Sequence, residues 1–475
     1  MRGAPRMRAL EGRVFLMLQG PQSVFFKELS RCLTSRGARI LKVQLCGGDV
    51  FLWNFCSRRV KSGAQQLLFR GRSSEWIQYV AALIDEEQVS DLLVYSDWRP
   101  LHQDAILIAK SRGVKVWVFE EGYLRRGYST LEQGGVNGRS SMPMTSTELV
   151  AEASELPPFE AAPSPPPNPI RAKVLYAIYH HMGNVILYFL FPHYHTHRPH
   201  NIFVELIGIL PRYLMRGRRK LRSARALSSF LRKNTPFFFY PLQLNSDSQI
   251  QLYSPYIRQE EAITHVIASF ARRAPKDARL LIKNHPLDNG LTPYRSFITN
   301  IAEALGVGHR VTYVEDGNLK PLIRRCCGVV LINSTVGLTA LLEHKPVFCL
   351  GMSIYNLPGL AQSVRNSSLD DFWEHTIPPN KYMLQAFCRL LNQRALIRGN
   401  FYGELGREYA CADAAARFAG EQGLKTVFSG HSRHSLRMLE RSAPGLQGTG
   451  YAAGAAGGTA ASSADTGEDT GRSHE

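Results

Sequence analysis

The sequence predicts an α/β protein with two Rossmann-like domains that face each other across a cleft. Three observations support this fold class. Short β-rich runs alternate with helical patterns from residue 14 onward, the same alternation returns at residue 237, and a proline-rich segment lies between the two regions. Strand–helix–strand repeats with glycine-containing turns are typical of parallel βαβ units. In addition, a chain of 475 residues exceeds what one hydrophobic core usually holds.

The first predicted domain covers residues 1–150. Its apolar runs predict strands at 14–18, 38–45, 90–97 and 114–122, and its amphipathic stretches predict helices at 23–35 and 102–113. The run at 14–18 ends in Gln-Gly-Pro and is shorter than the apolar core of a signal peptide. A buried strand is therefore expected there.

A linker and a basic insert are predicted over residues 151–235. The proline content of "ELPPFEAAPSPPPNP" at 155–169 excludes a helix or a central strand. Residues 170–230 then have a helical pattern, aromatic in the first part and basic in the second. The basic part is expected either to contact an anionic membrane surface or to form a solvated helix face. Its main cations are Arg216, Arg218, Arg219, Lys220 and Arg222.

The second predicted domain covers residues 236–440. Strands are expected at 237–243, 278–286, 310–317, 328–334 and 346–351, with helices at 257–273, 294–305, 319–326 and 335–343. Residues 441–475 are rich in glycine and alanine, and their low complexity predicts a disordered tail.

Composition narrows the classes of partner. A formal charge of +18 suits nucleic acid, an anionic membrane or phosphorylated substrates. No helix-turn-helix, RRM, KH or finger pattern accompanies the charge, so nucleic acid is the least favoured of the three. The apolar run at 185–191 is too short to span a bilayer.

Metal and disulfide sites are not indicated. The eight cysteines contain no CxxC pair, which suggests reduced thiols. The histidines of the insert fit no regular ligand spacing, so no metal site is expected from them; they are His180, His181, His193, His195, His197 and His200.

Candidate binding residues follow the strands of the second domain, because open α/β sheets bind ligands at the carboxyl ends of their strands. Lys283 and His285 could hold a phosphate or carboxylate, or His285 could be a turn residue stiffened by Pro286. The cluster Asn333, Ser334 and Thr335 opens a helix, where an anion is stabilised. The alternative is an ordinary N-cap, but that explains one hydroxyl only, so phosphate binding is preferred. The polar loop after the first strand adds Gln243 and Asp247.

The first domain offers two further candidates. Gly20 and Ser23 lie in the turn after its first strand, where Ser23 could simply cap the following helix. "VFEEGYLRR" places Glu120 and Glu121 at the end of another strand, near Arg125. Adjacent strand residues point to opposite faces, so one carboxylate is expected to face the cleft. A surface ion pair is the alternative, and from position alone the more probable one.

Several motifs together resemble one family. "FLMLQGPQSVFFKEL", "GGDVFLW", "DWRPLHQDAI", "VFEEGYLR", "TLEQGGVNG", "FYPLQLNSDSQI", "KNHPLDNG", "LINSTVGLTAL" and "GMSIYNLPGL" are similar, in order, to the capsule polysaccharide biosynthesis and export family, in particular its KpsS- and LipB-type members. Where this chain has Arg126, Gly127 and Tyr128, the family pattern leads us to expect a proline. The resemblance implies a GT-B-like, retaining β-Kdo glycosyltransferase.

Such an enzyme would move Kdo from CMP-Kdo to a lysophosphatidylglycerol acceptor and so start the linker of the capsular polysaccharide. The resemblance implies a peripheral protein on the cytoplasmic face of the inner membrane, with other capsule assembly and export proteins as further partners. It implies no cofactor. Two other hypotheses remain open: a non-catalytic accessory of polysaccharide export, and a glycosyltransferase with another nucleotide-sugar donor.

The resemblance also implies roles for single residues. Glu120 or Glu121 would be the nucleophile or the acid/base group, with Glu121 preferred as the neighbour of Gly122, and Asp247 would be the rival nucleophile. The donor's phosphate or carboxylate would contact residues of the second domain, namely Lys283, His285, Ser334, Thr335 and Gln243.

Overall fold

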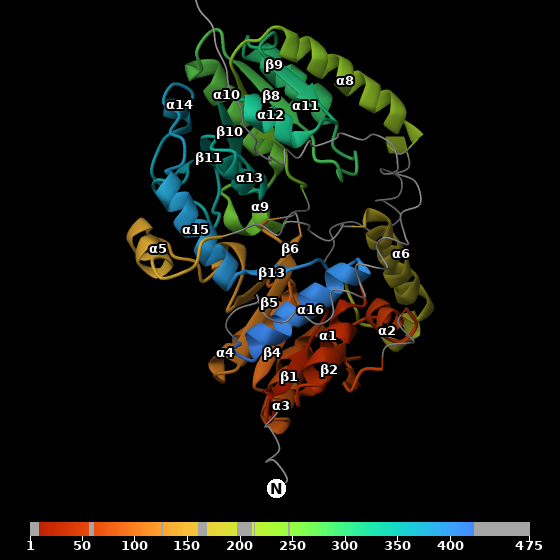
Figure 1. Ribbon diagram of the computed structural model, residues 1–475. Coiled ribbons are helices and arrows are strands. Elements are labelled where there is room, and N and C mark those ends of the chain that lie inside the picture. Colours follow the sequence, from red (N-terminus) through yellow and green to blue (C-terminus); the bar gives the residue numbers. More distant parts are fainter. Residues whose placement is uncertain are drawn as a thin grey trace, which may run out of the picture. The chain divides into compact units, whose positions relative to one another are not determined.

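The computed structural model describes residues 9–56, 61–124, 127–159, 169–196, 211–212, 214–245 and 248–421. Two sheets organise this part of the chain (Figure 1). The first sheet has the order β13-β6-β5-β4-β1-β2-β3. Its parallel strands are β1 (Val14–Met17), β2 (Arg39–Gln44), β3 (Gln65–Leu68), β4 (Asp91–Tyr95) and β5 (Lys115–Glu121), and its antiparallel edge is β6 (Tyr128–Gln133) and β13 (Leu396–Arg398).

Helices cover the first sheet because its strands are apolar on both faces. β1 and β2 are almost fully buried, as this packing requires. Pro100 occupies the first turn of α4, where its missing N–H costs no hydrogen bond. The helices are α1 (Phe25–Thr34), α2 (Gly47–Asn54), α3 (Trp76–Glu86), α4 (Pro100–Ser111) and α16 (Glu404–Phe418).

The second sheet has the order β12-β11-β10-β7-β8-β9, which is the doubly wound Rossmann order read from its far edge. Its strands are β7 (Phe237–Pro241), β8 (Arg279–Lys283), β9 (Val311–Val314), β10 (Gly328–Leu331), β11 (Val347–Cys349) and β12 (Gln362–Ser363). The helices of this region are α9 (Ser248–Tyr253), α10 (Gln259–Arg273), α11 (Tyr294–Ala304), α12 (Leu319–Arg325), α13 (Val336–Leu342), α14 (Leu369–Phe372) and α15 (Lys381–Arg394). The predicted fold class of two Rossmann-like sheets is confirmed.

The insert forms two long helices that pack on different sheets. α6 (Ile170–Ile186) lies against α2 of the first sheet, and α8 (Arg216–Arg232) packs on β9 of the second. Gly183 permits the close approach of α6, since a Cβ there would lie 2.8 Å from the carbonyl oxygen of Gly47. On α8, the Oγ of Ser223 accepts the N–H groups of Glu315 and Asp316, both at 3.2 Å.

The last described segment returns to the first sheet. β13 pairs with β6, and α16 packs on α1, so the blue helix lies beside a red one in Figure 1. Arg407 of α16 forms an ion pair with Glu28 of α1, with Nε and Oε2 2.9 Å apart. The prediction that residues 236–440 form a separate second domain therefore needs correction, because residues 396–418 complete the first sheet. Among the described helices, none has the length and apolar character needed to cross a membrane.

Candidate active site

Two adjacent carboxylates end β5 and have different partners. The Oε1 of Glu121 accepts hydrogen bonds from the Nζ of Lys173 at 2.6 Å and the hydroxyl of Tyr402 at 3.0 Å. Lys173 belongs to α6, and Tyr402 follows β13. This cation belongs to the segment between the two sheets.

Glu120 has no cation in direct contact among the described residues, and its pKa is shifted by burial. Burial raises the pKa of its carboxyl to about 7, opposed by hydrogen bonds from the backbone of Glu121 and the side chain of Ser96. Smaller effects come from Glu121, which raises this pKa, and from Arg99, which lowers it. A carboxyl that titrates near neutral pH is suited to accept and return a proton.

Two tyrosines connect the carboxylates. Tyr95 ends β4, and burial raises the pKa of its hydroxyl well above the usual value, with further contributions from Tyr402, Glu121 and Glu120. The pKa of Tyr402 is also raised by burial and by Glu121, with which it is hydrogen-bonded. Both hydroxyls are therefore neutral donors. Although strand alternation turns the two carboxylates apart, Tyr95 is close enough to both to respond to their charge.

Asp97 and Glu132 are buried carboxyls near this edge that were not singled out from the sequence. The Oδ2 of Asp97 accepts the N–H of Val136 at 3.2 Å, and burial raises the pKa of Asp97. Burial also raises the pKa of Glu132 to about 7, while its Oε1 accepts the hydroxyl of Tyr123 at 2.6 Å. Asp97 is the last residue of the strand predicted at 90–97, so the rule that selected Glu120 could have selected Asp97 as well.

On the second sheet, Gln243 and Asn333 form a buried reciprocal pair. The Nε2 of Gln243 donates to Oδ1 of Asn333, and the backbone N–H of Asn333 donates to Oε1 of Gln243, both at 3.0 Å. Gln243 is thus a positioning residue for Asn333. Asn333 and Thr335 line a small cavity together with Tyr123 and Asn137 of the first sheet's loops.

Ser334 acts as a local cap. Its Oγ accepts the N–H of Val336 at 3.2 Å, which is the role that the N-cap alternative assigns to it. Thr335 makes no side-chain capping bond and lines the cavity instead. The two hydroxyls are therefore used differently.

Lys283 is the last residue of β8, and His285 follows the strand. Lys283 is buried, its Nζ donates to the carbonyl of Asn284 at 3.2 Å, and burial lowers its pKa. The Nδ1 of His285 accepts the N–H of Leu287 at 3.1 Å, as in the turn alternative, and Pro286 is exposed.

The turn after β1 has a structural explanation. Ser23 is buried, and its Oγ accepts the N–H of Phe25 at 3.3 Å at the start of α1. A Cβ on Gly20 would lie 2.9 Å from the ring of Phe26, so packing requires glycine. Asp247 and Arg125 lie outside the described residues.

The basic helix α8 presents most of its expected cations to solvent. Arg216, Arg218, Lys220 and Arg222 are exposed. Arg219 departs from the expected membrane-facing set, because it is half-buried in an ion pair with Glu315 of the second sheet.

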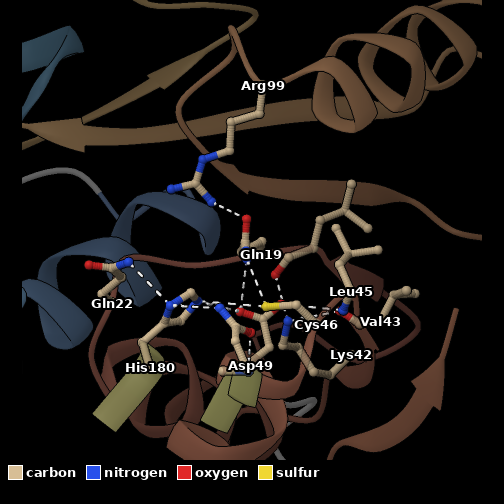
Figure 2. Close-up of polar contacts among 12 residues, drawn as sticks. Gln19, Gln22, Lys42, Val43, Leu45, Cys46, Asp49, Arg99 and His180 are labelled. Atoms are coloured by element: carbon tan, nitrogen blue, oxygen red, sulfur yellow. Dashed lines mark hydrogen bonds and ion pairs between the residues drawn. The ribbon is translucent and has the colours of Figure 1, made fainter. Parts of the chain in front are cut away.

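Among the described residues, one group has the composition of a metal site. Ligand atoms of Cys46, Asp49 and His180 lie within 4.8 Å of one another (Figure 2). The Nε2 of Gln19 donates into this group, to Oδ1 of Asp49 at 3.1 Å and to Sγ of Cys46 at 3.4 Å. The Lys42 ammonium is also close enough to interact with Asp49, and burial raises the pKa of the Cys46 thiol. These contacts describe a hydrogen-bonded network around a neutral thiol.

The chain has two doubly wound sheets, with carboxylates at the strand ends of the first sheet and a polar cluster at the strand ends of the second. This arrangement places it in the GT-B-like fold class. The chain belongs to the capsule polysaccharide biosynthesis protein family, whose family model matches residues 90–402.

Two named relatives support this membership. The capsule polysaccharide export protein KpsS of Escherichia coli is 30% identical over 411 residues, covering 85% of this chain and 100% of KpsS. The capsule polysaccharide modification protein LipB of Neisseria meningitidis serogroup B (strain ATCC BAA-335 / MC58) is 31% identical over 399 residues, covering 82% of this chain and 92% of LipB. A solved structure, the β-Kdo 2,7 transferase of Thermosulfurimonas dismutans KpsC, aligns with a TM-score of 0.42 at 13% identity, covering 86% of this chain and 100% of that one.

Proposed function

We propose that this protein is a retaining β-Kdo glycosyltransferase that moves Kdo from CMP-Kdo to a lysophosphatidylglycerol acceptor. The observation that carries the proposal is the adjacent carboxyl pair with different surroundings. Burial raises the pKa of Glu120 to about 7, whereas Glu121 is paired with Lys173. Two neighbouring carboxyls in different environments can take different roles in chemistry at a sugar. Membership of the capsule family supports a sugar as the group transferred.

The two carboxyls would have different roles in a double-displacement mechanism. In the first step, a carboxylate oxygen of Glu121 attacks the anomeric carbon of Kdo, and the bond from that carbon to the phosphate oxygen breaks, releasing CMP. In the second step, Glu120 takes the proton of the acceptor hydroxyl as that oxygen attacks the same carbon and displaces Glu121. Two inversions give net retention, and no cofactor is needed.

The second sheet would bind the donor. Lys283 and His285 at the end of β8 would contact the phosphate of CMP or the carboxylate of Kdo. Thr335, whose hydroxyl is not used for capping, would contact the phosphate, while Gln243 holds Asn333 in place.

The acceptor requires access to a membrane surface. The exposed cations of α8 are Arg216, Arg218, Lys220 and Arg222, and attraction of such cations to an anionic leaflet would hold the protein on the inner face of the inner membrane. A peripheral location of this kind needs no membrane-spanning helix.

The test is transfer with purified full-length protein, CMP-Kdo and lysophosphatidylglycerol, scored by CMP release and by product mass. Glu121→Gln should abolish both, and intact-mass spectrometry of Glu120→Gln should detect a Kdo adduct on Glu121, since the second step is slowed. Glu148→Gln, which changes an exposed carboxyl on α5 (Ser146–Ala153), is the matched control. Wild-type turnover in both active-site variants would contradict the assignment of Glu120 and Glu121 as catalytic residues.

A donor panel decides which nucleotide sugar is used. CMP-Kdo, CMP-sialate and uridine-diphosphate sugars are compared under the same conditions, with product mass as the readout. Preference for a donor other than CMP-Kdo would retain a glycosyltransferase but overturn the named substrate.

A second candidate function is a non-catalytic accessory of polysaccharide export. It is favoured by the name of the Escherichia coli relative and by the exposed cations of α8. If it is correct, neutralising Arg216, Arg218 and Lys220 should abolish capsule display in cells, while Glu121→Gln should display capsule normally. The transferase proposal gives the opposite result for Glu121→Gln.

A further inference from the structure

A cavity of about 210 Å³ lies at the carboxyl edge of the first sheet. It is formed by the ends of β1, β2 and β4, the segment after β3, and the segment that follows α6. Among its lining residues are Gln19, Arg70, Arg99, His102, His193 and Tyr194. This edge is where open α/β sheets bind ligands, yet Gly20 and Ser23, the candidates in the turn after β1, do not line this cavity.

Two arginines that form no ion pair with a described carboxylate line the cavity. The Arg99 guanidinium lies over the ring of Tyr95, 5.3 Å from its centroid, and its buried Nε has no hydrogen-bond partner among the residues that the structure describes. Arg70 is exposed and forms no ion pair with any described residue. Asp104 is the carboxylate among the lining residues. A partly buried guanidinium with no ion-pair partner among the described residues favours an anionic ligand, because the anion supplies the opposite charge.

Gln19 holds the Arg99 guanidinium in position through a hydrogen bond. The NH1 of Arg99 donates to Oε1 of Gln19 at 2.6 Å, and Figure 2 shows this contact above the network around Cys46 and Asp49. Because Nε2 of Gln19 donates to Asp49 and Cys46, the amide orientation is set and its oxygen faces Arg99. An arginine held in this way is preorganised for a ligand.

Exposed apolar side chains adjoin the basic cavity. Residues 191–196 form one wall, and they directly follow the 3₁₀ turn Tyr188–Leu190 at the end of α6. Val185, Tyr188 and Phe189 have 74%, 68% and 70% of their surfaces exposed. Large apolar side chains grouped on a surface mark a binding site for a partner or a lipid. A ligand that places an anionic group in the cavity and an apolar chain along these exposed side chains is an amphiphile.

We propose that this cavity binds the phosphate of a single-chain phospholipid acceptor, with its acyl chain along the exposed apolar residues at 185–189. The inference rests on the proposed function and names the acceptor's binding site. Arg99 also acts electrostatically on Glu120, lowering the pKa that burial raises. A head group bound by Arg99 would therefore present its hydroxyl near the residue proposed to remove the proton.

Binding can be measured without catalysis, which separates this inference from the proposed function. Short-chain lysophosphatidylglycerol, below its micelle concentration, is titrated into the full-length protein by calorimetry. Arg70→Ala and Arg99→Ala should each weaken binding about tenfold or more, since each removes charged contacts to phosphate. Arg72→Ala is the matched control, because Arg72 is exposed, carries the same charge and does not line the cavity.

Three further probes identify what the cavity recognises. Monoacylglycerol, which lacks the phosphate, should bind at least tenfold more weakly than the phospholipid; equal binding would overturn the anion site. Glycerol 3-phosphate and inorganic phosphate lack the acyl chain and should also bind more weakly; if either matches the lipid, the apolar strip is not part of the site. Arg70→Ala keeps the test decisive if Arg99→Ala fails to fold, since wild-type affinity in Arg70→Ala would contradict the proposal.

Discussion

Glu120→Gln should remove a proton-transfer step and, at the same time, stabilise the fold at alkaline pH. The ordinary pKa of the carboxyl is 4.5, and burial raises it to about 7 in the folded protein. A carboxyl with a raised folded pKa contributes stability that is fully present below its unfolded pKa and is lost as pH rises through about 7. The full difference corresponds to about 3 kcal/mol, of which about 2 to 3 kcal/mol is lost between pH 5 and pH 8. Glutamine mimics the protonated carboxyl and cannot ionise.

The measurement is urea unfolding at pH 5, 6, 7 and 8, together with the pH dependence of kcat/KM. The stability of Glu120→Gln should gain on wild type by about 2 to 3 kcal/mol over this range. Wild-type kcat/KM should rise with pH up to about 7 and then level off, because the ionised carboxylate is the base. In Glu120→Gln the rise should be absent and the rate about 10²- to 10⁴-fold lower.

Glu132→Gln is the matched control, since burial raises that pKa to about 7 as well. The stability of Glu132→Gln should also gain on wild type as pH rises, but its kcat/KM should still rise with pH as in wild type. A stability difference between Glu120→Gln and wild type that does not vary with pH would refute the reasoning about burial. A kinetic rise that survives in Glu120→Gln would refute its role as base.

Other expected outcomes follow from single contacts. Lys173→Met removes the cation on Glu121 and should slow CMP release about tenfold or more in single-turnover experiments; unchanged release would argue against Glu121 as the nucleophile. Gln243→Ala breaks a buried reciprocal hydrogen-bond pair. The loss in free energy of CMP binding, measured by calorimetry, should exceed the loss in free energy of unfolding, whereas intact CMP affinity would contradict a positioning role. Gly183→Val should destabilise the protein by about 1 to 3 kcal/mol in urea, because its side chain would enter α2. Gly217→Ala, in open space on α8, should instead leave stability unchanged or raise it.

The local strand pattern was predictable from the sequence. The strand expected at 114–122 is β5 (Lys115–Glu121), and the one expected at 278–286 is β8 (Arg279–Lys283). Continuous apolar runs of β-branched and aromatic residues indicate buried parallel strands whatever their neighbours are. The sequence did not predict β6, because "TLEQGG" has the pattern of a glycine-rich loop. In the structure, Thr130 and Leu131 of this segment are fully buried in the sheet.

Long-range packing was not predictable in the same way. Nothing local to Leu396–Arg398 or to α16 indicates which sheet they join. The partners of Glu121 are likewise distant in sequence, since Lys173 comes from the insert and Tyr402 from the returning segment. Sequence position could place Glu121 at a strand end, but only the fold supplies the cation that pairs with it.

The separate origins of these partners explain how two neighbouring carboxyls can have different surroundings. The surroundings of Glu120 come from the first sheet itself, through Ser96 and Arg99 after β4. Glu121 is instead contacted by Lys173, from the helix that ends beside the proposed acceptor cavity. A movement of α6 would therefore change the charge environment of Glu121 while leaving that of Glu120 largely intact. If the acyl chain of the acceptor binds at the end of α6, as we propose, acceptor binding and the reactivity of the nucleophile are coupled through one helix.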